Sequence, residues 1–227
     1  GRESLDATAE KLTNDTGSTV TGVVADTGYD DSVCNLIIEA KSILGGIDIL
    51  VNCAARPGGQ STVPTLAEVT TEEFNEHMNV KVMGYLRCAR EVAPIMIDQG
   101  WGRIINISGM ASRNTGTIVG SMRNVAVTAM AKNLAAELGM HGINVTVIHP
   151  GMTRTEATKG VVARRAAAEG ISEAEVEQKL AQGNLSGTII DSSDIAYVAT
   201  MLASPLSIAI NGDVIAAAGG TGTAIYY

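Results

Sequence analysis

The stretch WGRIINIS, residues 101–108, decides the fold class of this protein. Its apolar residues, among them Ile104, Ile105 and Ile107, predict a buried strand of a parallel sheet. A continuous apolar run, residues 47–53, precedes it and is typical of a parallel strand that is covered on both faces, and another run, residues 143–149, follows it. Long segments with helical spacing lie between the three runs. Buried strands that alternate with helices predict a doubly wound α/β fold with a parallel sheet.

The remaining elements follow from spacing and from end signals. Ser32 is the expected cap of one helix, and Gly45-Gly46 is its expected end. The helices are expected at residues 5–12, 32–44, 72–97, 118–138, 172–181 and 192–202, and two further strands at residues 20–25 and 213–218. No domain break interrupts this series, so we expect a single domain over residues 1–227.

Composition excludes several function classes. The net charge is −8, which is unfavourable for a nucleic-acid partner because such proteins present a basic face. No apolar run approaches the roughly 20 residues that a membrane span needs. The three cysteines, Cys34, Cys53 and Cys88, and the three histidines have no metal-ligand spacing. We expect a cytoplasmic protein with reduced thiols, no metal, and neither a membrane nor a nucleic-acid partner.

Several segments resemble, in order and spacing, the short-chain dehydrogenase/reductase family. They are DILVNCAA at 48–55, NVKVMG at 79–84, GRIINIS at 102–108, KNLAAEL at 132–138, the segment from Asn144 through Pro150-Gly151 to Thr155, NGD at 211–213 and Gly219-Gly220. The resemblance implies a Rossmann-like sheet with helices on both faces and an active-site Asn at Asn79. The family's first strand, first helix and second strand have no counterpart, so the N-terminal β-α-β portion is expected to be missing or truncated.

The chain departs from this family at its catalytic positions. The family's hydride transfer uses a Tyr, a Lys four residues later on the same helix face, and a Ser that hydrogen-bonds the substrate oxygen. The Tyr position falls on Gly120, the Lys position on Asn124 and the Ser position on Gly109. No Y-x-x-x-K sequence occurs anywhere in the chain. Only Asn79 matches the family's catalytic set, so the sequence predicts a degenerate member.

Cofactor binding is also expected to be lost. The family's Gly-rich turn lies on its first strand, and residues 16–22, TGSTVTG, have the wrong spacing and lead into a strand. The residues that match cofactor-binding positions are Asp26, Asn52, Ala54, Pro150, Gly151 and Thr155. Turn chemistry alone explains most of these types, so they are interpreted as vestigial. The sequence thus predicts that this chain binds no cofactor and that NAD is bound by a partner.

These observations predict a non-catalytic subunit of a hetero-oligomer, expected to be a tetramer, whose partner is a related, intact subunit. The inactive subunit of heteromeric hydroxyacyl-CoA dehydrogenases, such as that of anaerobic toluene degradation, is similar. The helices at 72–97 and 118–138 are the expected contact faces. One alternative is altered or cofactor-independent chemistry that uses Ser108, Asn79 or His149. Another is a ligand-sensing module that uses the family's cleft.

Overall fold

A parallel sheet of four strands forms the centre of the protein in the computed structural model, which describes residues 1–56, 63–222 and 225. The strand order is β1-β2-β3-β6, with β1 at Ile49–Asn52, β2 at Gly102–Ile107, β3 at Ile143–Pro150 and β6 at Val214–Ala217. All three ladders are parallel. Parallel neighbours need crossover connections, and helices supply them here. The α/β fold predicted from the sequence is confirmed.

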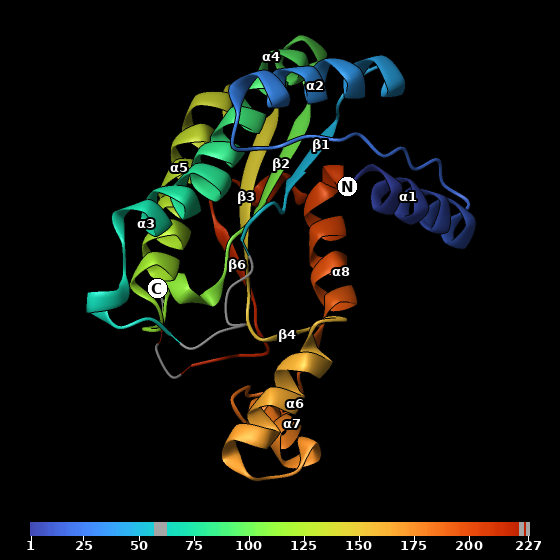
Figure 1. The fold of residues 1–227 in the computed structure, drawn as a ribbon. Helices are drawn as coiled ribbons and strands as arrows, with labels where there is room; N and C mark the ends of the chain where they lie inside the picture. Colours follow the sequence, from blue (N-terminus) through green and yellow to red (C-terminus); the bar gives the residue numbers. More distant parts are fainter. Residues whose placement is uncertain (57–62, 223–224, 226–227) are drawn as a thin grey trace.

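Helices cover both faces of this sheet (Figure 1). One face carries α2 (Asp30–Leu44), α4 (Gly84–Gln99) and α5 (Ile118–Leu138), and the other carries α8 (Ser192–Ala203). The larger core lies under the first group of helices and contains Val33, Tyr85, Val92, Met96, Ile104, Val127 and Val145. A smaller core lies under α8 and contains Ile105, Ile148 and Leu202. Burial on both sides fixes the carboxyl ends of β2 and β3 in place.

Three helices lie away from the centre of the sheet. Helix α1 (Arg2–Thr16) lies on the side of α8, and α6 (Thr158–Glu169) and α7 (Glu173–Gln182) form a pair at one end (Figure 1). The pair has its own small core of Val162, Ala166 and Val176. Two short strands, β4 (Thr153–Arg154) and β5 (Ile190–Asp191), connect it to the rest. Helix α6 was not predicted, because its Ala-rich and charged sequence gives little periodic signal.

The helix predicted over residues 72–97 is divided in the structure. It begins as α3 (Thr71–His77), continues as a π-helical stretch, η2 (Met78–Met83), and becomes α4 at Gly84. A π-helical stretch adds residues to a turn, so it changes which side chains face inward. Lys81 is the buried residue of this stretch. Simple helical spacing does not reveal such a change.

Three sequence predictions on local structure are wrong. Ser32 does not cap α2, which begins at Asp30; its hydroxyl instead accepts the backbone N–H of Asp26 at 2.8 Å. Residues 20–25 join no strand ladder. Strand β1 is not covered on both faces, because Ile49 and Val51 remain 44% and 42% exposed. It is an edge strand of the described sheet, and the side on which Ile49 and Val51 lie is left partly uncovered. Within the described residues, no helix combines the length and apolarity needed to cross a bilayer.

Candidate functional site

Polar residues gather where β2 and β3 end at their carboxyl edge. Ser108 and Gly109 follow β2, and His149 lies near the end of β3. Asn124 reaches this edge from α5, and Lys81 reaches it from η2. In doubly wound folds, the carboxyl ends of the strands are where ligands bind. This cluster is therefore the candidate active site.

The ammonium of Lys81 is the charged centre of the cluster. The residue is only 4% exposed, and its Nζ donates to the backbone oxygen of Ser108 at 3.0 Å and to Oδ1 of Asn124 at 2.9 Å. No carboxylate among the described residues forms an ion pair with it. Burial, and secondarily the nearby guanidinium of Arg123, lowers the pKa of Lys81 to about 8, against the opposing effect of Cys53. A buried cation without an acidic partner is costly in a folded protein, so this arrangement points to function.

Gly109 and Asn124, the family's Ser and Lys positions, adjoin each other in the structure. Asn124 is 5% exposed, and its Oδ1 faces Lys81. A Cβ atom built on Gly109 would stand 3.1 Å from Nδ2 of Asn124. The amide group thus lies against the place where the family's Ser side chain would begin. From the sequence, Gly109 and Asn124 count as two separate losses of catalytic groups. In the structure the two residues are neighbours.

Gly120, the family's Tyr position, lies in the first turn of α5. Its backbone N–H donates to Oγ1 of Thr117, the N-cap residue, at 2.9 Å. A Cβ atom on Gly120 would collide with that hydroxyl oxygen. The Thr117 cap therefore fills the space next to the position where the family carries its phenol. Capping and a bulky side chain compete for this space, so Gly120 has a local structural explanation.

Asn79 does not join the cluster. Its Nδ2 donates to the backbone oxygen of Gly28 at 3.1 Å, and its Oδ1 accepts from Nη2 of Arg87 at 2.9 Å. These contacts tie the loop before α2 to α4. Lys81, two residues further along the same quoted motif, is the residue that reaches Ser108 and Asn124. The sequence offered one signal for Lys81, which is a lysine within a largely apolar helical segment. Ordinary helical spacing does not show that it faces the core, because η2 is π-helical.

Ser112 and His149 form a second polar pair beside Gly109. The hydroxyl of Ser112 lies 2.8 Å from Nε2 of His149, and it donates to the backbone oxygen of Gly109 at 2.9 Å. The N–H of Gly109 donates to Nδ1 of His149 at 3.3 Å. Since Nδ1 accepts, a neutral ring carries its proton on Nε2 and donates to Ser112. Burial, followed by the charges of Arg113 and Lys81, lowers the pKa of His149 to about 4, so the ring is neutral.

This tautomer argues against hydrolase chemistry. A serine nucleophile needs a base that accepts its proton, and Nε2 of His149 is already protonated. Ser108 is no better placed, because its hydroxyl donates to the backbone oxygen of Asn124 at 3.1 Å. The alternative of cofactor-independent chemistry through Ser108, Asn79 or His149 therefore finds no activated group among these three residues.

The residues matched to cofactor positions fall into two groups. Asp26 and Asn52 are engaged in local structure: Asp26 accepts the backbone N–H of Gly28 at 2.8 Å, and Asn52 donates to Asn106 at 2.9 Å. Ala54 is exposed after β1. Pro150 and Thr155 instead line a cavity of about 600 Å³.

That cavity lies between α8 and the carboxyl ends of the strands. Its lining is mostly apolar and consists of Val51, Cys53, Ile107, Pro150, Thr153, Thr155, Ser192, Ile195, Ala196 and Ala199. Cys53 connects it to the polar cluster, because it is close enough to Lys81 to affect the pKa of the ammonium. Ile107 connects it as well, since it immediately precedes Ser108. A largely apolar cavity next to a few convergent polar groups is the usual form of a small-molecule site.

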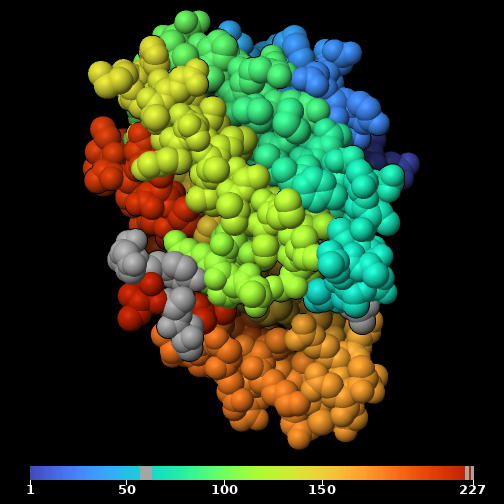
Figure 2. Space-filling model, turned by 90° about the vertical axis from the view of Figure 1, so that its left-hand side faces the viewer, coloured from blue at the N-terminus to red at the C-terminus, as the bar shows by residue number. Residues whose placement is uncertain are grey.

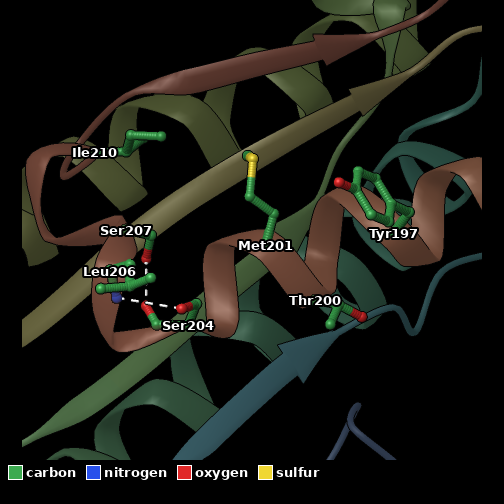
Figure 3. A pocket seen from close by; sticks show the side chains of 7 residues that line it. All are labelled: Tyr197, Thr200, Met201, Ser204, Leu206, Ser207 and Ile210. Atoms are coloured by element: carbon green, nitrogen blue, oxygen red, sulfur yellow. Dashed lines mark hydrogen bonds between the residues drawn. The ribbon is translucent and has the colours of Figure 1, made fainter.

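A second hollow, of about 440 Å³, lies between α8 and η5 (Pro205–Ala209), and Figure 3 shows its side chains. Its polar members are engaged locally: Thr200 donates to Ala196, and Ser207 donates to Leu202 and Ser204. The lining contains no charged side chain. Without a charged side chain to orient a ligand, this hollow is a weaker candidate.

The TGSTVTG segment, residues 16–22, is not a phosphate-binding turn. Gly17 ends α1 in the left-handed conformation, and its N–H donates to the oxygen of Thr13 at 2.9 Å. The segment thus lies at the carboxyl end of a helix, where exposed carbonyl oxygens disfavour an anion. A phosphate-binding turn lies at the amino end instead.

Comparison with known proteins decides the family. The family model described as enoyl-(acyl carrier protein) reductase matches residues 1–222. The chain belongs to the short-chain dehydrogenase/reductase family. The chain is 31% identical over 205 residues to the short-chain reductase protein NovJ of Streptomyces niveus, which is 90% of this chain and 75% of NovJ.

Two further relatives share this similarity. The chain is 35% identical over 201 residues to the chloroplastic NADPH-dependent aldehyde reductase 2 of Arabidopsis thaliana, covering 87% of this chain and 70% of that protein. The solved structure of a 7α-hydroxysteroid dehydrogenase complexed with NADH and 7-oxo glycochenodeoxycholic acid matches with a TM-score of 0.81. Its sequence is 28% identical, and the match covers 96% of this chain and 81% of the other.

These findings contradict the prediction of a non-catalytic subunit, because the similar members of the family are reductases and dehydrogenases. The prediction relied on three positions of the sequence, Gly109, Gly120 and Asn124. It overlooked Lys81, because only the folded chain brings that cation from η2 to the side chain of Asn124.

Proposed function

We propose that this protein is an oxidoreductase that interconverts a carbonyl compound and an alcohol with a nicotinamide nucleotide. The observation that carries the proposal is the buried ammonium of Lys81, held by neutral acceptors at the carboxyl ends of β2 and β3. The reductases and dehydrogenases of the family support the reaction class. The departures at Gly109, Gly120 and Asn124 are interpreted as a replacement of the family's catalytic groups and not as their loss.

The nicotinamide end of the nucleotide fits the residues present. Pro150, Thr153 and Thr155 line the cavity along the segment that lies against the cofactor in the family. The backbone N–H of Gly151 is bound to the oxygen of Ala217, which holds this segment against β6. A Cβ atom on Gly151 would stand 2.9 Å from Cβ of Ala218, so glycine permits the close packing there. These residues would hold the nicotinamide ring and its ribose.

When bound, the reduced nucleotide supplies a hydride to the carbonyl carbon, and the oxygen takes a proton from water, so that one carbonyl compound yields one alcohol. The chain's own contribution is electrostatic. Lys81 and Arg123 are buried cations, and among the described residues no carboxylate pairs with either side chain. Fixed positive charge in a dry site stabilises the negative charge that develops on oxygen. His149, being neutral, adds no competing charge.

The sequence alone predicts that this chain binds no cofactor, whereas the proposed function requires a bound nicotinamide nucleotide. Calorimetric titration of the purified protein with NADH and with NADPH decides between the two. We expect saturable binding of at least one nucleotide. The competing prediction expects none.

The reaction itself is tested by following nucleotide oxidation with a panel of aldehydes and ketones. We expect nucleotide consumption that depends on the carbonyl compound and falls strongly in Lys81→Met. Lys132→Met is the matched control, because Lys132 is an exposed lysine on α5. An absence of both nucleotide binding and turnover would contradict the proposal.

We also propose that the face formed by α4 and α5 binds a second, related chain. Figure 2 shows these two helices side by side on one face of the molecule. Several apolar side chains are exposed on or next to them: Met83 40%, Ile118 45%, Met122 50% and Val125 50%. Their burial against a related surface would remove apolar area from water. The oligomeric state and a cytoplasmic location remain predictions, and light scattering measures the former.

A further inference from the structure

We propose that Asn124 binds the reacting oxygen of the substrate through its side-chain N–H groups, and that Lys81 is the positioning residue that fixes the direction of this amide. The proposal rests on the oxidoreductase function proposed above. It names the group that replaces the family's Ser hydroxyl.

The direction of the amide follows from the chemistry of its neighbour. An ammonium has three hydrogen-bond donors and no acceptor, so the atom of Asn124 that faces Lys81 must be the oxygen. Nζ of Lys81 lies 2.9 Å from Oδ1 of Asn124. The NH₂ group therefore points the other way, toward Gly109. Without the lysine, both flips of the amide would be available.

Because residue 109 is a glycine, no side chain from that position covers the NH₂ group. A Cβ atom there would stand 3.1 Å from Nδ2 of Asn124, which is tighter than normal packing tolerates without movement. The backbone of Gly109 is extended, so the glycine is not required by its conformation. The two residues are thus linked, because a side chain at residue 109 would crowd the amide of Asn124.

Asn124 is also rigid where it is attached to the helix. Its backbone oxygen accepts from the hydroxyl of Ser108 at 3.1 Å and from the hydroxyl of Thr128 at 3.2 Å. Its Nδ2 has no hydrogen-bond partner within the described part of the chain. The backbone N–H of Gly109 is already used by His149. The amide of Asn124 is therefore the donor that remains for a substrate oxygen.

Because Nζ of Lys81 donates directly to Oδ1 of Asn124, a change in the charge of Lys81 should affect the amide. The charged and titratable groups around Lys81 are Arg123 on α5, Cys53 after β1, Tyr85 on α4 and His149 on β3. None of them is a carboxylate. Loss of the proton from Lys81 removes its charge and leaves a lone pair that can accept from an N–H group, so the preference of the Asn124 amide for one direction weakens.

The first experiment tests the orientation without any reaction. The two side-chain N–H signals of Asn124 are identified in a ¹⁵N-labelled sample as the pair that is missing in Asn124→Asp. We expect these signals to shift as the pH is raised through about 8, and we expect the shift to vanish in Lys81→Met but to persist in Lys132→Met. Signals that do not respond to pH, or that respond equally in Lys81→Met, would overturn the role of Lys81.

The same signals test oxygen binding. Sodium acetate is the probe, because it is a small molecule with only oxygen acceptors. We expect added acetate to shift the Asn124 signals in the natural protein and not in Gly109→Ala, whose methyl group fills the space. The extended backbone at residue 109 accepts alanine without strain. No shift at saturating acetate would contradict an accessible donor at Asn124.

The last experiment is kinetic and uses the carbonyl compound that the panel identifies. Asn124→Asp keeps the shape of the side chain but removes both N–H donors, and we expect kcat/KM to fall by about 10²–10³-fold. Asn133→Asp is the control, because Asn133 is an exposed residue on the same helix. Undiminished kcat/KM in Asn124→Asp would overturn the inference. If neither nucleotide binding nor turnover is found, the proposed function fails, while the acetate result still decides whether Asn124 offers an accessible donor.

Discussion

Two buried cations on one continuous helical run serve different purposes in this protein. Arg87, which is 8% exposed, donates from Nε to Asp30, from Nη1 to the oxygens of Thr27 and Asn79, and from Nη2 to the side chain of Asn79. Lys81, which is 4% exposed, has only neutral acceptors on Ser108 and Asn124. The arginine has a carboxylate partner and four hydrogen bonds, whereas the lysine has no carboxylate partner and two.

This difference separates a structural cation from a functional one. A paired and hydrogen-bonded guanidinium compensates its own desolvation and fastens a loop to the helix. An ammonium whose partners are neutral keeps a positive potential around it, which can stabilise negative charge on a ligand. Burial alone therefore does not identify a functional cation, and the partners have to be examined.

The largest effect on stability is expected at Arg87. In Arg87→Met, the ion pair with Asp30 and the bonds to Thr27 and Asn79 are lost, so we expect the free energy of unfolding to fall by about 3 kcal/mol. Urea denaturation measures it. Arg90→Met is the matched control, because Arg90 also pairs with Asp30 but is half exposed, and we expect a loss below about 1 kcal/mol. Equal losses in both variants would contradict the structural role of burial at Arg87.

A smaller effect is expected from the proton on Lys81. The folded protein lowers the pKa of Lys81 to about 8 from an ordinary value of 10.5, so the unfolded chain binds more protons between these values. Stability should therefore rise with pH across this window, by on the order of 2 kcal/mol relative to Lys81→Met. The difference between the two proteins in urea midpoint at neutral and at alkaline pH measures it. Parallel pH profiles would show that Lys81 is not desolvated.

Replacement of Lys81 at neutral pH should change stability still less. Lys81→Met loses two hydrogen bonds but also removes the cost of burying an unpaired charge, so we expect a change below about 1 kcal/mol. Reductase activity should nevertheless fall by about 10²-fold or more. Thermal unfolding and initial rates on the same samples test both. A loss of stability as large as that in Arg87→Met would show that Lys81 has a structural role like that of Arg87.

The smallest effect on the folded chain is expected on the proposed contact surface of α4 and α5. Val125 is 50% exposed on α5, so Val125→Arg should change the free energy of unfolding by less than about 0.5 kcal/mol. It should still lower the oligomeric mass, because it places a charge in the proposed contact between chains. Light scattering measures the mass, and Leu206→Arg is the control, because Leu206 is 92% exposed and lies in η5, outside α4 and α5. An unchanged mass would place the contact elsewhere.

The family and most of the fold were predictable from local sequence patterns. Helix α5 has the bounds that its sequence indicated, and strand β2 is one residue shorter at each end than predicted. The edge position of β1 was not predictable, because an apolar run does not report how many neighbours a strand has. The site was predictable in part: residues after β2 and in α5 were identified, and Asn79 was chosen where the structure places Lys81.

The sequence by itself determined the parallel α/β architecture and the absence of a Tyr–Lys pair at the family's spacing, since both are read from residues that are close along the chain. Only the tertiary structure decided what replaces that pair. Lys81 and Asn124 come from different helices, and their contact depends on the π-helical turn in η2 and on a glycine at position 109. A hydrogen bond between distant segments is set by the packing of the whole sheet and its helices, and no local pattern encodes it.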